Sequence, residues 1–86
     1  MENGNGKWKV NIKGVRRIRI TGDYIKLDAL LKYASVASTG GEAKIMIQSG
    51  EVFVNSDRST ARGKKIKPGD IVRCGSSVFL IDKYDN

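Results

Sequence analysis

The chain contains no histidine, and its 86 residues include only one cysteine, one proline and one tryptophan. Histidine is the usual general base near neutral pH and the commonest metal ligand, so its absence removes the ordinary starting point for a catalytic or metal site. The single cysteine, Cys74, excludes a disulfide within the chain and suits a reducing compartment. Because Cys74 falls in an apolar run that predicts a strand, packing is its expected role.

Long hydrophobic stretches are also missing. No apolar segment is long enough to cross a bilayer or to form the core of a signal peptide, which predicts a cytoplasmic protein without membrane contact. The chain is also too short for two separate cores, so we expect one domain with little interior left for a small-molecule substrate. Hydrophobic residues still make up 40% of the chain, which indicates a folded domain rather than a disordered basic tail.

Positive charge is what the sequence has in excess. Sixteen Lys and Arg residues against nine Asp and Glu residues give a net charge of +7. Such an excess attracts polyanions, nucleic acid first and anionic membranes second, although it could serve solubility alone. The acidic residues are scattered and each has a local explanation in a cap, a turn or a helix surface. We therefore expect no catalytic residue, no metal ligand and no cofactor.

The first part of the chain predicts a flexible N-terminus over residues 1–6 and a basic strand extension over residues 7–17. Apolar and basic side chains alternate up to Gly14 with the period of a half-buried strand, and a second strand is expected over residues 15–20. Gly14 between them predicts a hairpin turn or a bulge. The alternation places Trp8 in the core, with stacking on a nucleic-acid base as the less favoured alternative.

Two short helices are expected next. Apolar side chains over residues 25–34 have helical spacing. The second helix is expected to begin at Thr39, where Thr-Gly-Gly-Glu matches a capping box, and to end at Gly50. Gly40 and Gly41 would let a phosphate approach the positive end of this helix, although they could instead allow the two helices to pack closely.

The remainder of the chain predicts a small, mostly antiparallel sheet. Strands are expected over residues 52–54, 71–74 and 77–81. Residues 55–65 are polar and predict a loop, Pro68-Gly69 suits the two central positions of a type II turn, and Gly75-Ser76 predicts a tight hairpin. Residues 82–86 are expected to form a polar tail.

Cations gather on this loop and on its exit, with no acidic residue among them: Arg58, Arg62, Lys64, Lys65 and Lys67. Like charges repel one another, so the arrangement is easier to understand if a polyanion relieves the repulsion, with a solvated loop as the alternative. We expect these cations and those near residues 40–44 to converge on one patch. Tyr24, Tyr33 and Tyr84 lack sheet-wise spacing, so no aromatic base-stacking platform of the RRM kind is expected.

Four segments, taken in order, resemble the RNA-binding module named after small-subunit ribosomal protein S-four, also called the alpha-L RNA-binding motif. They are residues 26–32, 39–44, 50–55 and 63–70, and the resemblance covers roughly residues 18–81. The Gly-Gly pair and the Arg-Gly-Lys-Lys loop resemble most closely the small stand-alone bacterial members of the YaaA and YbcJ type. The resemblance implies an α+β fold, two helices packed on a small sheet, with an RNA surface made by the helices and the following loop.

The resemblance also implies RNA contacts at matching positions. Thr39 and Gly40 stand where many members have Ser-Arg, so one arginine that would hold a phosphate is missing here. Together with the local chemistry, the resemblance gives a predicted RNA-binding set of Lys26, Lys32, Thr39, Gly40, Gly41, Lys44, Asn55, Arg58, Arg62, Lys64, Lys65 and Lys67.

The leading hypothesis is a non-catalytic protein that binds structured RNA, either ribosomal or transfer RNA, with ribosomal particles as further candidate partners. A protein-interaction module that presents the edge of the N-terminal strands is one alternative. A duplex-DNA binder is another, although no recognition-helix pattern is present. An enzyme comes last, because larger relatives fuse this module to catalytic domains for which this chain has no room.

Overall fold

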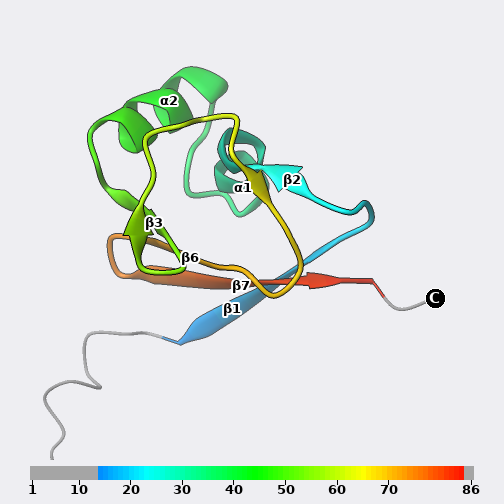
Figure 1. Ribbon diagram of the computed structural model, residues 1–86. Coiled ribbons are helices and arrows are strands. Elements are labelled where there is room, and N and C mark those ends of the chain that lie inside the picture. Colours follow the sequence, from blue (N-terminus) through cyan, green and yellow to red (C-terminus); the bar gives the residue numbers. More distant parts are fainter. Residues whose placement is uncertain (1–13, 85–86) are drawn as a thin grey trace, which may run out of the picture.

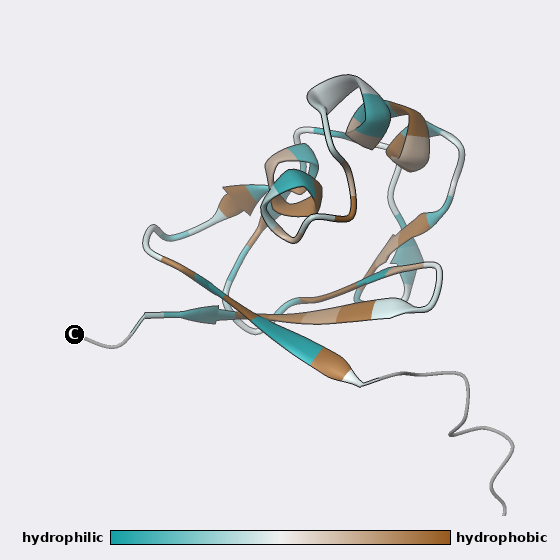
Figure 2. Ribbon diagram, turned by 180° about the vertical axis from the view of Figure 1, so that it is seen from behind, coloured by the Kyte–Doolittle hydropathy of each residue, from teal (hydrophilic) through white to brown (hydrophobic). Residues whose placement is uncertain are grey.

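Two helices lie on one side of a five-stranded sheet in the computed structural model, which describes residues 14–84 (Figure 1, Figure 2). The predicted flexible N-terminus, the first seven residues of the basic strand extension (7–13, with Trp8) and the last two residues of the predicted tail lie outside the described residues. The elements in chain order are β1 (Val15–Ile20), β2 (Ile25–Lys26), α1 (Leu27–Tyr33), α2 (Gly40–Gln48), β3 (Val52–Val54), β4 (Asp57–Arg58), β5 (Lys65–Ile66), β6 (Ile71–Cys74) and β7 (Ser77–Lys83).

The predicted α+β architecture with a mostly antiparallel sheet is confirmed. The five strands lie in the order β1-β7-β6-β3-β4, and β2 and β5 form a separate antiparallel pair. Only β1 and β7 run parallel, which places the first and last described strands side by side. The sequence did not predict this pairing. It joins residues 15–17, which we had assigned to the strand extension, to the same sheet as the rest of β1.

The core lies between the helices and the sheet. Leu27, Leu30 and Leu31 of α1, Ile47 of α2 and Phe79 of β7 are all fully buried there. Burial of one such side chain stabilises the fold by roughly 1.5–3 kcal/mol, so this small cluster supplies a large part of what holds the domain together. Strand β1 alternates as predicted, with its isoleucines buried and the neighbouring arginines exposed.

The first helix begins later than the periodicity predicted. We expected a helix over residues 25–34, but Ile25 and Lys26 are extended and pair with β5, and the helix begins at Leu27. The reason is a tertiary contact, because Ile25 lies opposite Ile66, a residue far along the chain. A few apolar residues fit the spacing of a helix and of a strand equally well, so the local pattern could not separate them.

The polar segment over residues 55–65 is likewise not a loop throughout. Asp57 and Arg58 pair with β3, and Lys65 begins β5. Strands of two residues are too short to show a period of two, so only the pairing partner defines them.

The predicted capping box at Thr39 and the predicted turn at Pro68-Gly69 are present. The Thr39 hydroxyl accepts a hydrogen bond from the Glu42 N–H at 3.1 Å, as in a capping box. The Glu42 carboxylate reaches back one residue further than expected and accepts from the Ser38 N–H. Gly69 has a φ of +98°, and the Asp70 N–H donates to the Lys67 carbonyl at 2.9 Å, as a type II turn at Pro68-Gly69 requires.

Candidate nucleic-acid interface

The basic loop is fixed to the start of helix α1. The backbone N–H of Leu27 donates to the Lys64 carbonyl at 2.9 Å, and that of Asp28 donates to the Arg62 carbonyl at 3.1 Å. The first N–H groups of a helix have no partner within the helix, so these loop carbonyls satisfy them. The loop therefore has a defined position relative to α1, although it contains no long element of its own.

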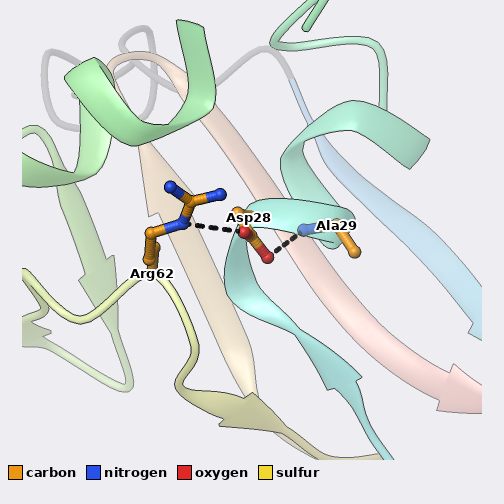
Figure 3. Close-up of polar contacts among 3 residues, drawn as sticks. All are labelled: Asp28, Ala29 and Arg62. Carbon is orange, nitrogen blue, oxygen red and sulfur yellow. Dashed lines mark hydrogen bonds and ion pairs between the residues drawn. The ribbon is translucent and has the colours of Figure 1, made fainter. Parts of the chain in front are cut away.

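One loop cation is already paired. The Arg62 Nε lies 3.1 Å from the Asp28 Oδ2, and the other carboxylate oxygen of Asp28 accepts from the Ala29 N–H at 2.8 Å (Figure 3). This ion pair joins the loop to the first turn of α1 a second time. Much of the Arg62 charge is compensated within the protein, so an RNA contact by this residue stays a prediction.

Four lysines gather beside this junction, and we refer to them as the lysine cluster: Lys26, Lys64, Lys65 and Lys67. Lys26 and Lys65 are direct neighbours across the β2–β5 pair, and both are exposed. Residues that face each other across antiparallel strands have Cβ atoms roughly 5 Å apart, so two positive charges share one small area. The Lys65 Nζ lies 4.9 Å from the centre of the Tyr24 ring, where cation–π attraction holds it.

Asp70 lies close to the other two members of the lysine cluster. Its partial burial acts to raise the pKa of the carboxyl group, but the Lys67 N–H, the Asn55 side chain and the charges of Lys64 and Lys67 outweigh burial, so the pKa is lowered. One carboxylate therefore compensates only part of the charge on this side of the cluster.

Asn55 connects strand β3 to the same turn. Its side-chain amide donates to Asp70 at 2.9 Å, and its side-chain oxygen accepts from the Ile71 N–H at 2.9 Å. Its φ is +51°, in the left-handed region that asparagine tolerates better than most residues. These contacts give Asn55 a structural role, and the RNA contact that the family resemblance implies for it stays a prediction.

Arg58 lies on the opposite side of the sheet from the helices. The buried Val52 and Val54 point toward the core, so Phe53 between them points away from it, and Arg58 is its cross-strand neighbour. The guanidinium carbons of Arg58 and Arg73 lie 5.4 and 4.9 Å from the centre of the Phe53 ring. We call these three residues the arginine face.

The convergence of these cations on one patch stays a prediction, because Arg58 stacks on Phe53 with Arg73 and yet lines one hollow of about 350 Å³ together with Lys64. The loop begins with an arginine on the outer face of the sheet and ends with lysines beside α1, because its two ends belong to different strand pairs.

The start of helix α2 is open. A Cβ atom added at Gly40 would meet no atom within 4 Å, and one added at Gly41 would meet only the Thr39 hydroxyl at 3.8 Å. Close packing of the two helices therefore does not require these glycines, which was the alternative explanation for them. Lys32 in α1 and Lys44 in α2 are exposed, and within residues 14–84 no hydrogen bond or ion pair engages either side chain.

The described residues offer little for catalysis. No group of three or more Cys, Asp or Glu side chains among residues 14–84 is arranged to hold a metal ion. Cys74 is buried in the core as expected, and burial, followed by the charge of Glu51, raises the pKa of its thiol. A protonated, buried thiol is a poor nucleophile. Neither described helix has the length and apolar character needed to cross a membrane.

The structure brings together three tyrosines that the sequence left apart. Tyr24, Tyr33 and Tyr84 come from three different segments, yet they line two adjoining hollows beside strand β1. Their spacing in the sequence follows neither a strand nor a helix, so no local pattern could have identified the group.

Comparison with known proteins defines the family. The model of the S4 domain family matches residues 18–82, which is most of the chain. The chain belongs to the S4 domain family. The probable ribosome maturation protein RlbA of Bacillus subtilis (strain 168) is 40% identical over 55 residues, which cover 64% of this chain and 78% of RlbA.

A solved structure shares the S4 fold. The solution structure of a tyrosyl-tRNA synthetase C-terminal domain superposes on this chain with a TM-score of 0.68 and covers 91% of this chain and 87% of its own. Because only 22% of the residues are identical, this likeness concerns the fold alone. The family predicted from the four sequence segments is confirmed.

Proposed function

We propose that this S4 domain is a non-catalytic, cytoplasmic RNA-binding protein that holds structured ribosomal RNA against the lysine cluster and the exposed sides of α1 and α2. The observation that carries the proposal is the position of Lys26 directly opposite Lys65. Like charges that face each other across two strands destabilise the pairing, so this arrangement lowers the stability of the folded protein. A bound phosphate relieves that repulsion.

The chemistry of the cluster suits a sugar–phosphate backbone. Lysines act as point charges that tolerate a range of phosphate positions, and most contacts to nucleic-acid phosphates set position rather than read sequence. Backbone hydrogen bonds from α1 to the Arg62 and Lys64 carbonyls fix the loop backbone beside α1, so the lysines of the loop extend from a defined segment. Helical RNA is recognised mainly by shape and through phosphates and 2′-hydroxyls, which such a surface can contact.

One comparison favours ribosomal RNA over transfer RNA. The curated relative at 40% identity is named a probable ribosome maturation protein, whereas the synthetase domain is similar only in fold. Competition between a ribosomal RNA fragment, a transfer RNA and a DNA duplex of matched length measures which of the three the protein binds most tightly. Preference for the DNA duplex would contradict the proposal, because only RNA carries the 2′-hydroxyl.

A matched pair of charge reversals tests the surface itself. Lys65→Glu places a negative charge opposite Lys26 and should weaken RNA binding about tenfold while lowering the slope of log affinity against log salt by roughly one unit. The same change should leave the fold intact or slightly more stable, because the opposite charges now attract. Arg73→Glu removes the same charge from the arginine face and should leave the salt slope unchanged.

Fluorescence anisotropy across a salt series measures both variants, and urea unfolding measures their stability. Equal losses in the two variants would mean that overall charge, and not the lysine cluster, drives binding. A salt-independent affinity of the unmodified protein would contradict RNA binding through phosphates altogether.

A further inference from the structure

Three exposed tyrosines border one open groove along strand β1. Tyr24, Tyr33 and Tyr84 are 44%, 56% and 45% exposed, which is a large aromatic surface for so small a domain. One hollow, of about 820 Å³, runs along β1, and the next, of about 420 Å³, continues past its end. Arg19, Tyr33 and Tyr84 line both hollows, so the two form a single groove.

Hydrogen bonds to β1 position two of these tyrosines. The N–H of Tyr84 donates to the Ile20 carbonyl at 3.1 Å, which fixes the residue beside the end of β1. The Tyr33 hydroxyl makes a long hydrogen bond of 3.5 Å to the Arg19 carbonyl. The neighbouring Tyr84 side chain, followed by slight desolvation, raises the pKa of Tyr33 above its ordinary value.

The charges around the groove are suited to a nucleic-acid strand. The Arg17 Nε lies 3.6 Å from the Asp82 Oδ2, and the Lys83 Nζ lies 3.2 Å from the Asp23 Oδ1. Arg17 and Lys83 are therefore each paired with a carboxylate. Arg19 is exposed, and no ion pair among the described residues includes it. Tyr24 continues the groove to the lysine cluster, because the Lys65 ammonium lies 4.9 Å from its ring.

We infer that this groove stacks unpaired nucleobases of an RNA strand that leaves a helical segment held on the lysine cluster. Proteins bind single-stranded RNA through aromatic rings beside cations, because every base has a face that can stack on such a ring. The inference rests on the proposed RNA-binding function, and it names the part of the RNA that lies beyond the helix: a single-stranded flank or a bulge.

The test uses two RNA hairpins, one blunt and one with a short oligoadenylate overhang, prepared in both overhang polarities. The unmodified protein should bind one overhang form roughly tenfold more tightly than the blunt form, an amount typical of stacking one base. Tyr33→Leu and Tyr84→Leu should abolish this advantage and retain the affinity for the blunt hairpin. Tyr33→Phe and Tyr84→Phe keep the rings and should keep the advantage; circular dichroism verifies the fold of all four.

The outcomes separate this inference from the proposed function. Equal affinity for the blunt and overhang hairpins, or an advantage that survives both leucine variants, would contradict base stacking in the groove. Neither result would contradict RNA binding by the lysine cluster. Failure to bind even the blunt hairpin would overturn the proposed function. A tyrosine-dependent dimer in light scattering without RNA would assign the groove to a protein contact and overturn the inference as well.

Discussion

The lysine cluster and the arginine face carry charge of the same sign but differ in what compensates it. On the arginine face, Arg58 and Arg73 stack on one phenylalanine ring. In the lysine cluster, Lys26 and Lys65 face each other, and of these two only Lys65 has an aromatic partner, Tyr24, among residues 14–84. The comparison shows that an excess of basic residues in a sequence does not measure the charge available to a ligand.

The side chains explain the difference. The planar guanidinium of arginine stacks on aromatic rings and pairs with carboxylates in fixed geometry, so the fold itself uses arginine readily. Arg16 and Arg62 do the same elsewhere, the first over the Phe79 ring with a hydrogen bond to the Ala34 carbonyl, the second on Asp28. The compact, strongly hydrated ammonium of lysine has less to gain from such contacts and stays at the surface.

The largest expected effect removes the core that both regions share. Phe79→Ala empties a fully buried site in β7 and withdraws the ring beneath Arg16, so we expect the free energy of unfolding to fall by about 3–5 kcal/mol. Urea denaturation measures the loss. A fall of less than about 1 kcal/mol would mean that the lysine cluster and the arginine face do not depend on one common core.

Asn55→Ala should separate stability from binding on the helix side. The change removes two side-chain hydrogen bonds and leaves alanine at a φ of +51°, so we expect a loss of about 1–3 kcal/mol. RNA affinity should change by less than the Lys65→Glu value if the role of Asn55 is structural. A large loss of affinity at unchanged stability would instead support its predicted RNA contact.

Acid should reduce the difference between Asn55→Ala and the unmodified protein. The folded-state pKa of Asp70 is lowered, so its contribution to stability is fully present above the ordinary aspartate pKa and is lost as the pH falls through the folded value. Part of that lowering comes from Asn55. Urea unfolding at several pH values should therefore show the largest difference near neutrality, and a difference that grows on acidification would contradict this.

Phe53→Leu tests the arginine face. Leucine keeps the apolar contact but removes the ring that Arg58 and Arg73 share, which should lower stability by about 1 kcal/mol. With both arginines released, RNA affinity should stay the same or rise slightly. A clear loss of RNA affinity would show that the comparison between the two faces is wrong.

The smallest expected effect concerns the start of α2. Gly41→Ala places a methyl group at ordinary contact distance from Thr39 and should stabilise the helix by up to about 1 kcal/mol. If a phosphate approaches this backbone, the same methyl group should weaken RNA binding. Unchanged affinity with raised stability would remove Gly41 from the predicted RNA-binding set.

Most of the fold could be predicted from short-range signals. The capping box at Thr39, the Pro68-Gly69 turn and the strand alternation of β1 and β3 each depend on residues close together in the chain, where local backbone preferences decide the outcome. The predictions failed where the pairing partners are distant in the chain. Strands β2 and β5 are defined only by their pairing with each other, and β1 pairs with β7 across almost the whole described chain.

The candidate site was likewise predictable only in part. From the sequence alone we could name Lys26, Lys64 and Lys65 as candidate phosphate contacts, but not that Lys26 and Lys65 lie face to face. Nor could spacing reveal that Arg62 is paired with Asp28 or that Arg58 stacks on Phe53.

The sequence by itself determined the family, the two helices, the alternation of β1 and the excess of positive charge, because these follow from residue type and local spacing. Only the tertiary structure decided which cations are compensated by partners among residues 14–84, and that three tyrosines meet beside β1. Compensation and clustering depend on distances between side chains from separate strands and loops, and a chain acquires those distances only when it folds.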